Sequence, residues 1–128
     1  MSAQFRTPMK IAAGLGSARS GAHHFMVQRI TAVALIALGL WVVWIALDVL
    51  HMDYAAARAL IAKPWNALLM IAFLIASFWH AQLGLQVVIE DYVHTTGFGI
   101  ALQIAVKFAC FLGAAAGVLA VIRVALGS

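Results

Sequence analysis

Three long apolar stretches dominate the chain, at residues 30–47, 65–89 and 98–122. The first two contain no Asp, Glu, Lys or Arg, and the third contains only Lys107. About 20 apolar residues in a helix cross the roughly 30 Å hydrocarbon core of a bilayer. Because lipid offers no partners for open backbone groups, such segments must be helical. The sequence therefore predicts an all-α integral membrane protein with three transmembrane helices.

The composition also favours a membrane environment over water. Of the 128 residues, 66% are hydrophobic and 9% are charged, and the mean hydropathy is +1.04. A soluble domain of this size would need far more polar surface. The net charge of +4 would suggest nucleic acid in a soluble protein, but in this chain it indicates a positive-inside signal and no nucleic-acid partner. A single cysteine, Cys110, excludes an internal disulfide and a cysteine-cluster metal site.

The charged residues predict how the chain is oriented. Residues 1–29 hold four of the eight Lys and Arg, and we expect them to form a polar cytoplasmic tail before a membrane domain at 30–128. Its helices are expected near residues 30–50, 65–89 and 98–123. The loop at 51–63 holds two Lys or Arg and the loop at 90–97 holds none. Since the first helix usually dominates orientation, we expect a cytoplasmic N-terminus and a periplasmic C-terminus.

His80 lies deep inside the second apolar stretch. It is 15 residues after Trp65 and nine before Ile89, or roughly 22 Å and 14 Å from the two ends of a helix. An ionisable residue at such depth indicates a functional site, although a neutral histidine bonded to another helix is an alternative. A neutral imidazole is the usual axial ligand of haem iron, and Gly84 on the same face would leave room for a macrocycle. A second axial histidine would have to come from another chain.

Polar residues also gather at the end of this stretch, in the segment from Glu90 to His94. Tyr92 could donate a hydrogen bond to a quinone carbonyl, and Asp91 or His94 could relay protons. A solvated helix end is the alternative interpretation. Arg29, expected on the same side of the membrane, suits bidentate binding of a carboxylate such as a haem propionate. A simple positive-inside flank would explain Arg29 equally well.

Lys107 is the charged residue inside the third apolar stretch. It is expected about one turn inside the membrane, where its amine can reach the cytoplasmic surface by snorkelling. The alternative is an ion pair with an acidic lipid headgroup or a haem propionate.

Together these motifs resemble the hydrophobic membrane anchor of succinate dehydrogenase, the D-type chain of complex II. The resemblance covers residues 14–128. It is carried by Gly21-Ala22-His23-His24-Phe25, Gln28-Arg29-Ile30-Thr31-Ala32, His80-x3-Gly84 and Asp91-Tyr92-Val93. Residues 14–18 are similar to the alphaproteobacterial and mitochondrial-type branch of this family.

The resemblance implies roles for individual residues. His80 matches the axial ligand of haem b, with a histidine of a C-type, cytochrome b556-like anchor chain on the other side of the iron. Tyr92 matches the tyrosine that hydrogen-bonds the ubiquinone carbonyl, and Asp91 stands beside it. His23 and Arg29 match positions near the haem propionates. The flavin, the iron–sulfur clusters and the succinate site belong to the flavoprotein and iron–sulfur subunits of such a complex.

The function expected from this resemblance is electron transfer in the bacterial inner membrane. The chain would help to pass electrons from succinate to ubiquinone, a step linked to the tricarboxylic acid cycle, and would catalyse nothing alone. The alternatives are an anchor of a quinol:fumarate reductase and a haem-free structural or proton-conducting membrane subunit. No role is assigned to His24, since its position varies among relatives.

Overall fold

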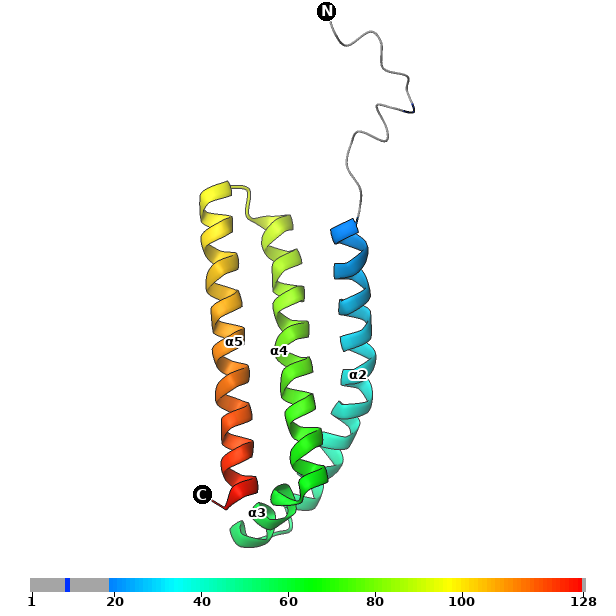
Figure 1. The fold of residues 1–128 in the computed structure, drawn as a ribbon, viewed down its shortest axis with the longest axis vertical. Helices are drawn as coiled ribbons and strands as arrows, with labels where there is room; N and C mark the ends of the chain where they lie inside the picture. The colour runs from blue at the N-terminus through cyan, green and yellow to red at the C-terminus, as the bar shows by residue number, and fades with distance from the viewer. Residues whose placement is uncertain (1–8, 10–18, 128) are drawn as a thin grey trace, which may run out of the picture.

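The computed structural model describes Met9 and residues 19–127, and all of its secondary structure is helical over these residues. The elements in chain order are α2 (Arg19–Val49), α3 (Tyr54–Ala62), α4 (Pro64–Tyr92) and α5 (Thr96–Leu126) (Figure 1). Within the described part of the chain, α2, α4 and α5 are long and apolar enough to cross a membrane. The predicted all-α fold with three membrane-spanning helices is confirmed.

The first membrane helix extends well beyond its apolar stretch. α2 begins at Arg19, so the boundary expected near residue 30 falls inside this helix. Residues 19–49 contain no proline, and a helix that leaves the hydrocarbon region can continue through polar residues because its backbone bonds are internal. Residues 14–18 and most of the expected tail lie outside the described residues.

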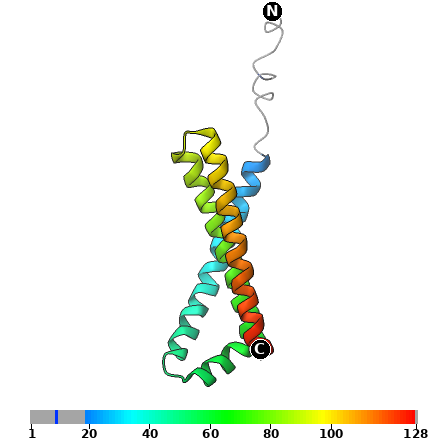
Figure 2. The same ribbon diagram turned by 90° about the vertical axis from the view of Figure 1, so that its left-hand side faces the viewer.

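A short helix replaces much of the loop expected at 51–63. Asp53 caps the start of α3, and its side chain accepts a hydrogen bond of 2.7 Å from the Ala56 N–H. An aspartate at this position satisfies one of the free N–H groups of the first turn, and the alanines that follow are strong helix formers. Pro64 then starts α4 directly after Lys63. Figure 2 shows the end of α2 diverging from the base of α4, with α3 spanning the distance between them.

α4 is the central helix of the bundle. It packs against α2 on one side and against α5 on the other, while α3 contacts α4 and α5 at one end (Figure 1). The start of α2, the end of α4 and the start of α5 therefore lie together at the opposite end of the bundle. The residues near Arg29 and those near Tyr92 share this end, as the sequence predicts. Which side of the membrane this end faces stays a prediction.

Close approach of α5 to α4 depends on two glycines. A Cβ atom on Gly113 would lie 2.6 Å from Cε1 of Phe78, and one on Gly117 would lie 3.1 Å from Cδ1 of Leu74. Small residues four positions apart allow membrane helices to pack closely. Few side chains are buried elsewhere, since the buried apolar residues of the described chain are Ile45, Ala67, Leu83, Ile89 and Val121. Most of the apolar surface is thus left for lipid or for other chains.

Candidate functional site

The imidazole of His80 on α4 is hydrogen-bonded to Thr31 on α2. The distance between Thr31 Oγ1 and His80 Nδ1 is 3.1 Å. The same hydroxyl oxygen lies 2.9 Å from the Val27 carbonyl oxygen and 3.0 Å from that of Gln28. Both backbone carbonyls can only accept, and when they hold the single hydroxyl proton, Oγ1 can accept from an Nδ1–H of His80. The second ring nitrogen, Nε2, then carries the free lone pair.

His80 also lines a pocket between α2 and α4. The pocket has a volume of about 190 Å³ and is formed by Phe25, Gln28, Arg29, Ala32 and His80. The guanidinium carbon of Arg29 lies 5.0 Å from the centre of the Phe25 ring, within the range of a cation–π interaction. The structure therefore brings together His80 and Arg29, two of the predicted site residues, from different helices.

These residues fit one side of a haem site. The pocket offers an imidazole nitrogen and a guanidinium group, and a Cβ atom on Gly84, one turn beyond His80, would meet nothing within 4 Å. A volume of about 190 Å³ is smaller than the ~300–1,000 Å³ of pockets that enclose a ligand. Any haem would therefore need a second wall from another chain. The described residues contain no group of three or more His, Cys, Asp or Glu that could hold a metal ion by themselves.

The other predicted site residues lie at the same end of the bundle but not in this pocket. Asp91 and Tyr92 form the last turn of α4, which ends with its cap at Val93. Both side chains are exposed, and Tyr92 is 78% exposed. His23, in the first turns of α2, is exposed as well. The described residues leave Tyr92 open on the surface, so a quinone site there would need surfaces from other subunits.

A polar pocket that the sequence analysis missed lies near the end of α4. It has a volume of about 290 Å³ and is lined by Gly21, His24, Gln86, Val87 and Glu90. Glu90 accepts a hydrogen bond of 2.8 Å from the Gln86 amide, and its Oε1 lies 3.5 Å from Nε2 of Gln103. Nε2 of His24 is buried and has no hydrogen-bonding partner among the described residues. Such atoms normally bind water or another polar group.

The only sequence signal for this second pocket was the spacing of Gln86 and Glu90. Residues four positions apart lie on one face of a helix and can bond to each other. His24, on α2, could not be connected to them without knowledge of how α2 packs on α4.

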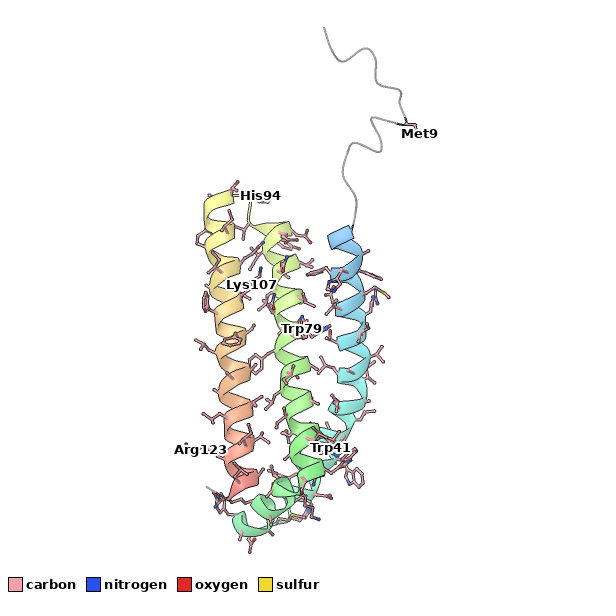
Figure 3. The ribbon with its side chains drawn as sticks, in the orientation of Figure 1. Met9, Trp41, Trp79, His94, Lys107 and Arg123 are labelled. Atoms are coloured by element: carbon pink, nitrogen blue, oxygen red, sulfur yellow. The ribbon has the colours of Figure 1, made fainter. Side chains whose placement is uncertain are left out.

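Lys107 is a residue of α5 and lies against a different side of α4 from the His80 pocket. It lines a mainly apolar groove of about 170 Å³ between α4 and α5, together with Trp79, Gln82 and Cys110. This groove shares no lining residue with the His80 pocket. Figure 3 shows Lys107 nearer to the end of the bundle that carries His94 than to the end that carries Arg123. The placement agrees with an amine that reaches the nearer membrane surface.

Known proteins resemble this chain over nearly its full length. Residues 3–114 match the family of succinate dehydrogenase/fumarate reductase transmembrane subunits. The chain is 37% identical over 121 residues to the succinate dehydrogenase hydrophobic membrane anchor subunit of Rickettsia bellii, with 94% of this chain and 97% of that protein covered. It is 30% identical over 128 residues to the protein of the same name from Paracoccus denitrificans, with coverages of 98% and 96%. No solved structure is a significant match.

These similarities confirm the resemblance that the sequence motifs indicated. The apolar helices and the family together make the chain a multi-pass protein of the bacterial inner membrane with the role of a membrane anchor. The chain belongs to the family of succinate dehydrogenase/fumarate reductase transmembrane subunits.

Proposed function

We propose that this chain anchors a succinate dehydrogenase in the membrane, where it supplies one side of a haem b site and one side of a ubiquinone site. The observation that carries the proposal is the pocket shared by His80 and Arg29. In this pocket, Nδ1 of the His80 imidazole is hydrogen-bonded to Thr31, which would leave the lone pair of Nε2 for a ligand bond. The guanidinium group of Arg29 lines the same pocket. An axial ligand and a partner for a carboxylate are the two groups that a haem with propionates requires.

Each residue of the haem site has a defined task in this proposal. His80 would provide Nε2 as one axial ligand of the iron, and the C-type, cytochrome b556-like anchor chain would provide the other. Arg29, held over the Phe25 ring, would bind a propionate, and His23 would lie near the propionates at the start of α2. The bound haem would supply a one-electron carrier between the iron–sulfur subunit and the quinone.

The quinone site would lie at the end of α4. Reduction of ubiquinone to ubiquinol takes up two electrons and two protons. The Tyr92 hydroxyl would donate a hydrogen bond to one quinone carbonyl, and Asp91 would pass protons to the reduced ring. The exposure of both side chains agrees with a site that is completed by the partner anchor chain and the iron–sulfur subunit.

The names of the relatives favour succinate oxidation over the reverse reaction. Both are called succinate dehydrogenase subunits. An anchor of a quinol:fumarate reductase would instead carry electrons from quinol to fumarate. Oxidation of succinate would take place on the flavoprotein subunit, so this chain alone would catalyse nothing.

A haem-free proton-conducting subunit is less well supported. It would need polar side chains that continue the path from His80 through the membrane. Gln82, two residues further along α4, lines the groove towards α5 and not the pocket of His80.

Purification of the complex through a tag on this chain tests the proposal. The flavoprotein, the iron–sulfur subunit and a second anchor chain should co-purify, and a reduced-minus-oxidised spectrum should show one b-type haem per complex. The complex should reduce ubiquinone with electrons from succinate. Isolation of the chain without these partners would refute the anchor assignment, and a complex that reduces quinone at full rate without haem would refute the haem site.

A further inference from the structure

We propose that Thr31 is a positioning residue that holds His80 in one tautomer and one ring orientation, and thereby lowers the reduction potential of the bound haem. The inference rests on the proposed function, because it concerns the haem that His80 would ligate. Thr31 lies on α2 and would not itself bind the iron.

The burial of Thr31 is the first observation that supports this role. Thr31 is 8% exposed and is the one buried polar residue in the described part of the chain. A polar side chain is buried at a cost unless its hydrogen bonds are satisfied. Thr31 meets this condition with two carbonyls of its own helix and with the imidazole of His80.

The direction of the hydrogen bonds is the second observation. Val27 and Gln28 hold the hydroxyl proton of Thr31 on the α2 side, at 2.9 and 3.0 Å. The β-branched side chain has few rotamers in a helix, and this bond to the backbone selects one of them. The oxygen lone pair is thus aimed at Nδ1 of His80, 3.1 Å away. With the hydroxyl proton held by the carbonyls, only a proton on Nδ1 makes this contact favourable, so Nε2 is left free to bind iron.

The effect on the haem follows from the chemistry of ligand imidazoles. A hydrogen bond donated by Nδ1–H makes the ring a stronger electron donor and restricts its rotation about the metal–nitrogen bond. A stronger donor stabilises the oxidised iron more than the reduced iron, which lowers the reduction potential. Removal of the acceptor should therefore raise the potential and weaken haem binding, by roughly tenfold or more if Thr31 acts as other partners of metal-bound histidines do.

Three substitutions in the whole complex separate this role from simple packing. Thr31→Val keeps the shape of the side chain and removes the hydroxyl, and Thr31→Ala removes the hydroxyl together with the branch. Thr31→Ser keeps the hydroxyl and removes only a methyl group. The measurements are a redox titration of the haem, its electron paramagnetic resonance spectrum and the haem content per flavin.

The hydroxyl-free variants should show a higher midpoint potential, a changed resonance spectrum and less retained haem, while Thr31→Ser should match the wild type. An unchanged potential and spectrum in Thr31→Val would show that Thr31 only packs. A Thr31→Ser variant that shifts as far as Thr31→Val would also overturn the inference, because the methyl group would then be responsible. If the hydroxyl-free variants do not assemble, the comparison of Thr31→Ser with the wild type still tests the inference, because a shifted potential and spectrum in Thr31→Ser would overturn it. A wild-type complex without haem would instead refute the proposed function.

Discussion

Gly113 on α5 packs directly against the ring of Phe78 on α4. A Cβ atom at Gly113 would lie 2.6 Å from Cε1 and 2.8 Å from Cζ of that ring. Contacts below 3 Å force one of the two groups to move, and a ring held between two helices has little freedom to do so. This pair sets how closely the two helices approach near the middle of the bundle, where Phe78 lies two residues before His80 on α4.

Replacement of Gly113 with Leu should destabilise the bundle. Overpacking of a close contact typically costs about 1–3 kcal/mol, so we expect a lower midpoint in thermal unfolding followed by circular dichroism in detergent. Gly39→Leu is the matched control, because a Cβ atom on Gly39 meets nothing within 4 Å. Equal midpoints for the two variants would show that α5 does not depend on this contact.

Replacement of His80 with Leu should abolish or severely weaken haem binding, because an aliphatic side chain offers the iron no lone pair. The substitution is apolar, so the helix should still insert into the membrane. His51→Leu is the control, since His51 is exposed near α3, where its Nδ1 lies 3.1 Å from the Leu47 carbonyl oxygen. The reduced-minus-oxidised spectrum reports the result, and a full, unshifted b-type band in the His80 variant would refute the ligand assignment.

Replacement of Tyr92 with Phe should slow quinone reduction severalfold or more. The change keeps the ring and removes a hydroxyl whose hydrogen bond has a net contribution on the order of 1 kcal/mol, where 1.4 kcal/mol corresponds to about a tenfold change. Succinate oxidation with an artificial acceptor that takes electrons upstream should stay near wild type, as should the haem content.

Tyr54 offers a matched control for this experiment. It is 81% exposed and lies at the start of α3, whereas Tyr92 is 78% exposed at the end of α4. Tyr54→Phe should leave quinone reduction unchanged. If Tyr92→Phe has equally little effect, the phenol of Tyr92 serves only as an anchor in the membrane interface.

The predicted orientation can be tested with single cysteines after Cys110→Ala. Ala56 lies on α3 and Thr96 begins α5, at opposite ends of the bundle, and both are exposed. An impermeant thiol reagent added outside the inner membrane should label Ala56→Cys and spare Thr96→Cys, since the more basic end is expected in the cytoplasm. The reverse pattern would move Tyr92 away from cytoplasmic subunits and would contradict the quinone site as well.

Much of the architecture follows from the sequence alone. In lipid, an apolar stretch of sufficient length has to be a helix, so hydropathy is enough to identify three spans. The depth of His80 follows from the same argument, because its distance from the ends of the span is a matter of counting residues. Hydropathy does not predict where a helix begins or ends outside the lipid. For this reason α3 and the early start of α2 at Arg19 are found only in the structure.

The pairing of residues across helices could be decided only by tertiary structure. A helix that is apolar on all sides does not reveal which face packs on a neighbour, or at what height. Hydropathy therefore could not predict that Thr31 would reach Nδ1 of His80, or that Gly113 would lie against Phe78. These contacts depend on the rotation and register of α2 and α5 on α4, which are set by many small packing interactions at once. The sequence determined that His80 lies deep in an apolar span, and the packing of α2 on α4 determined which of its ring nitrogens contacts Thr31.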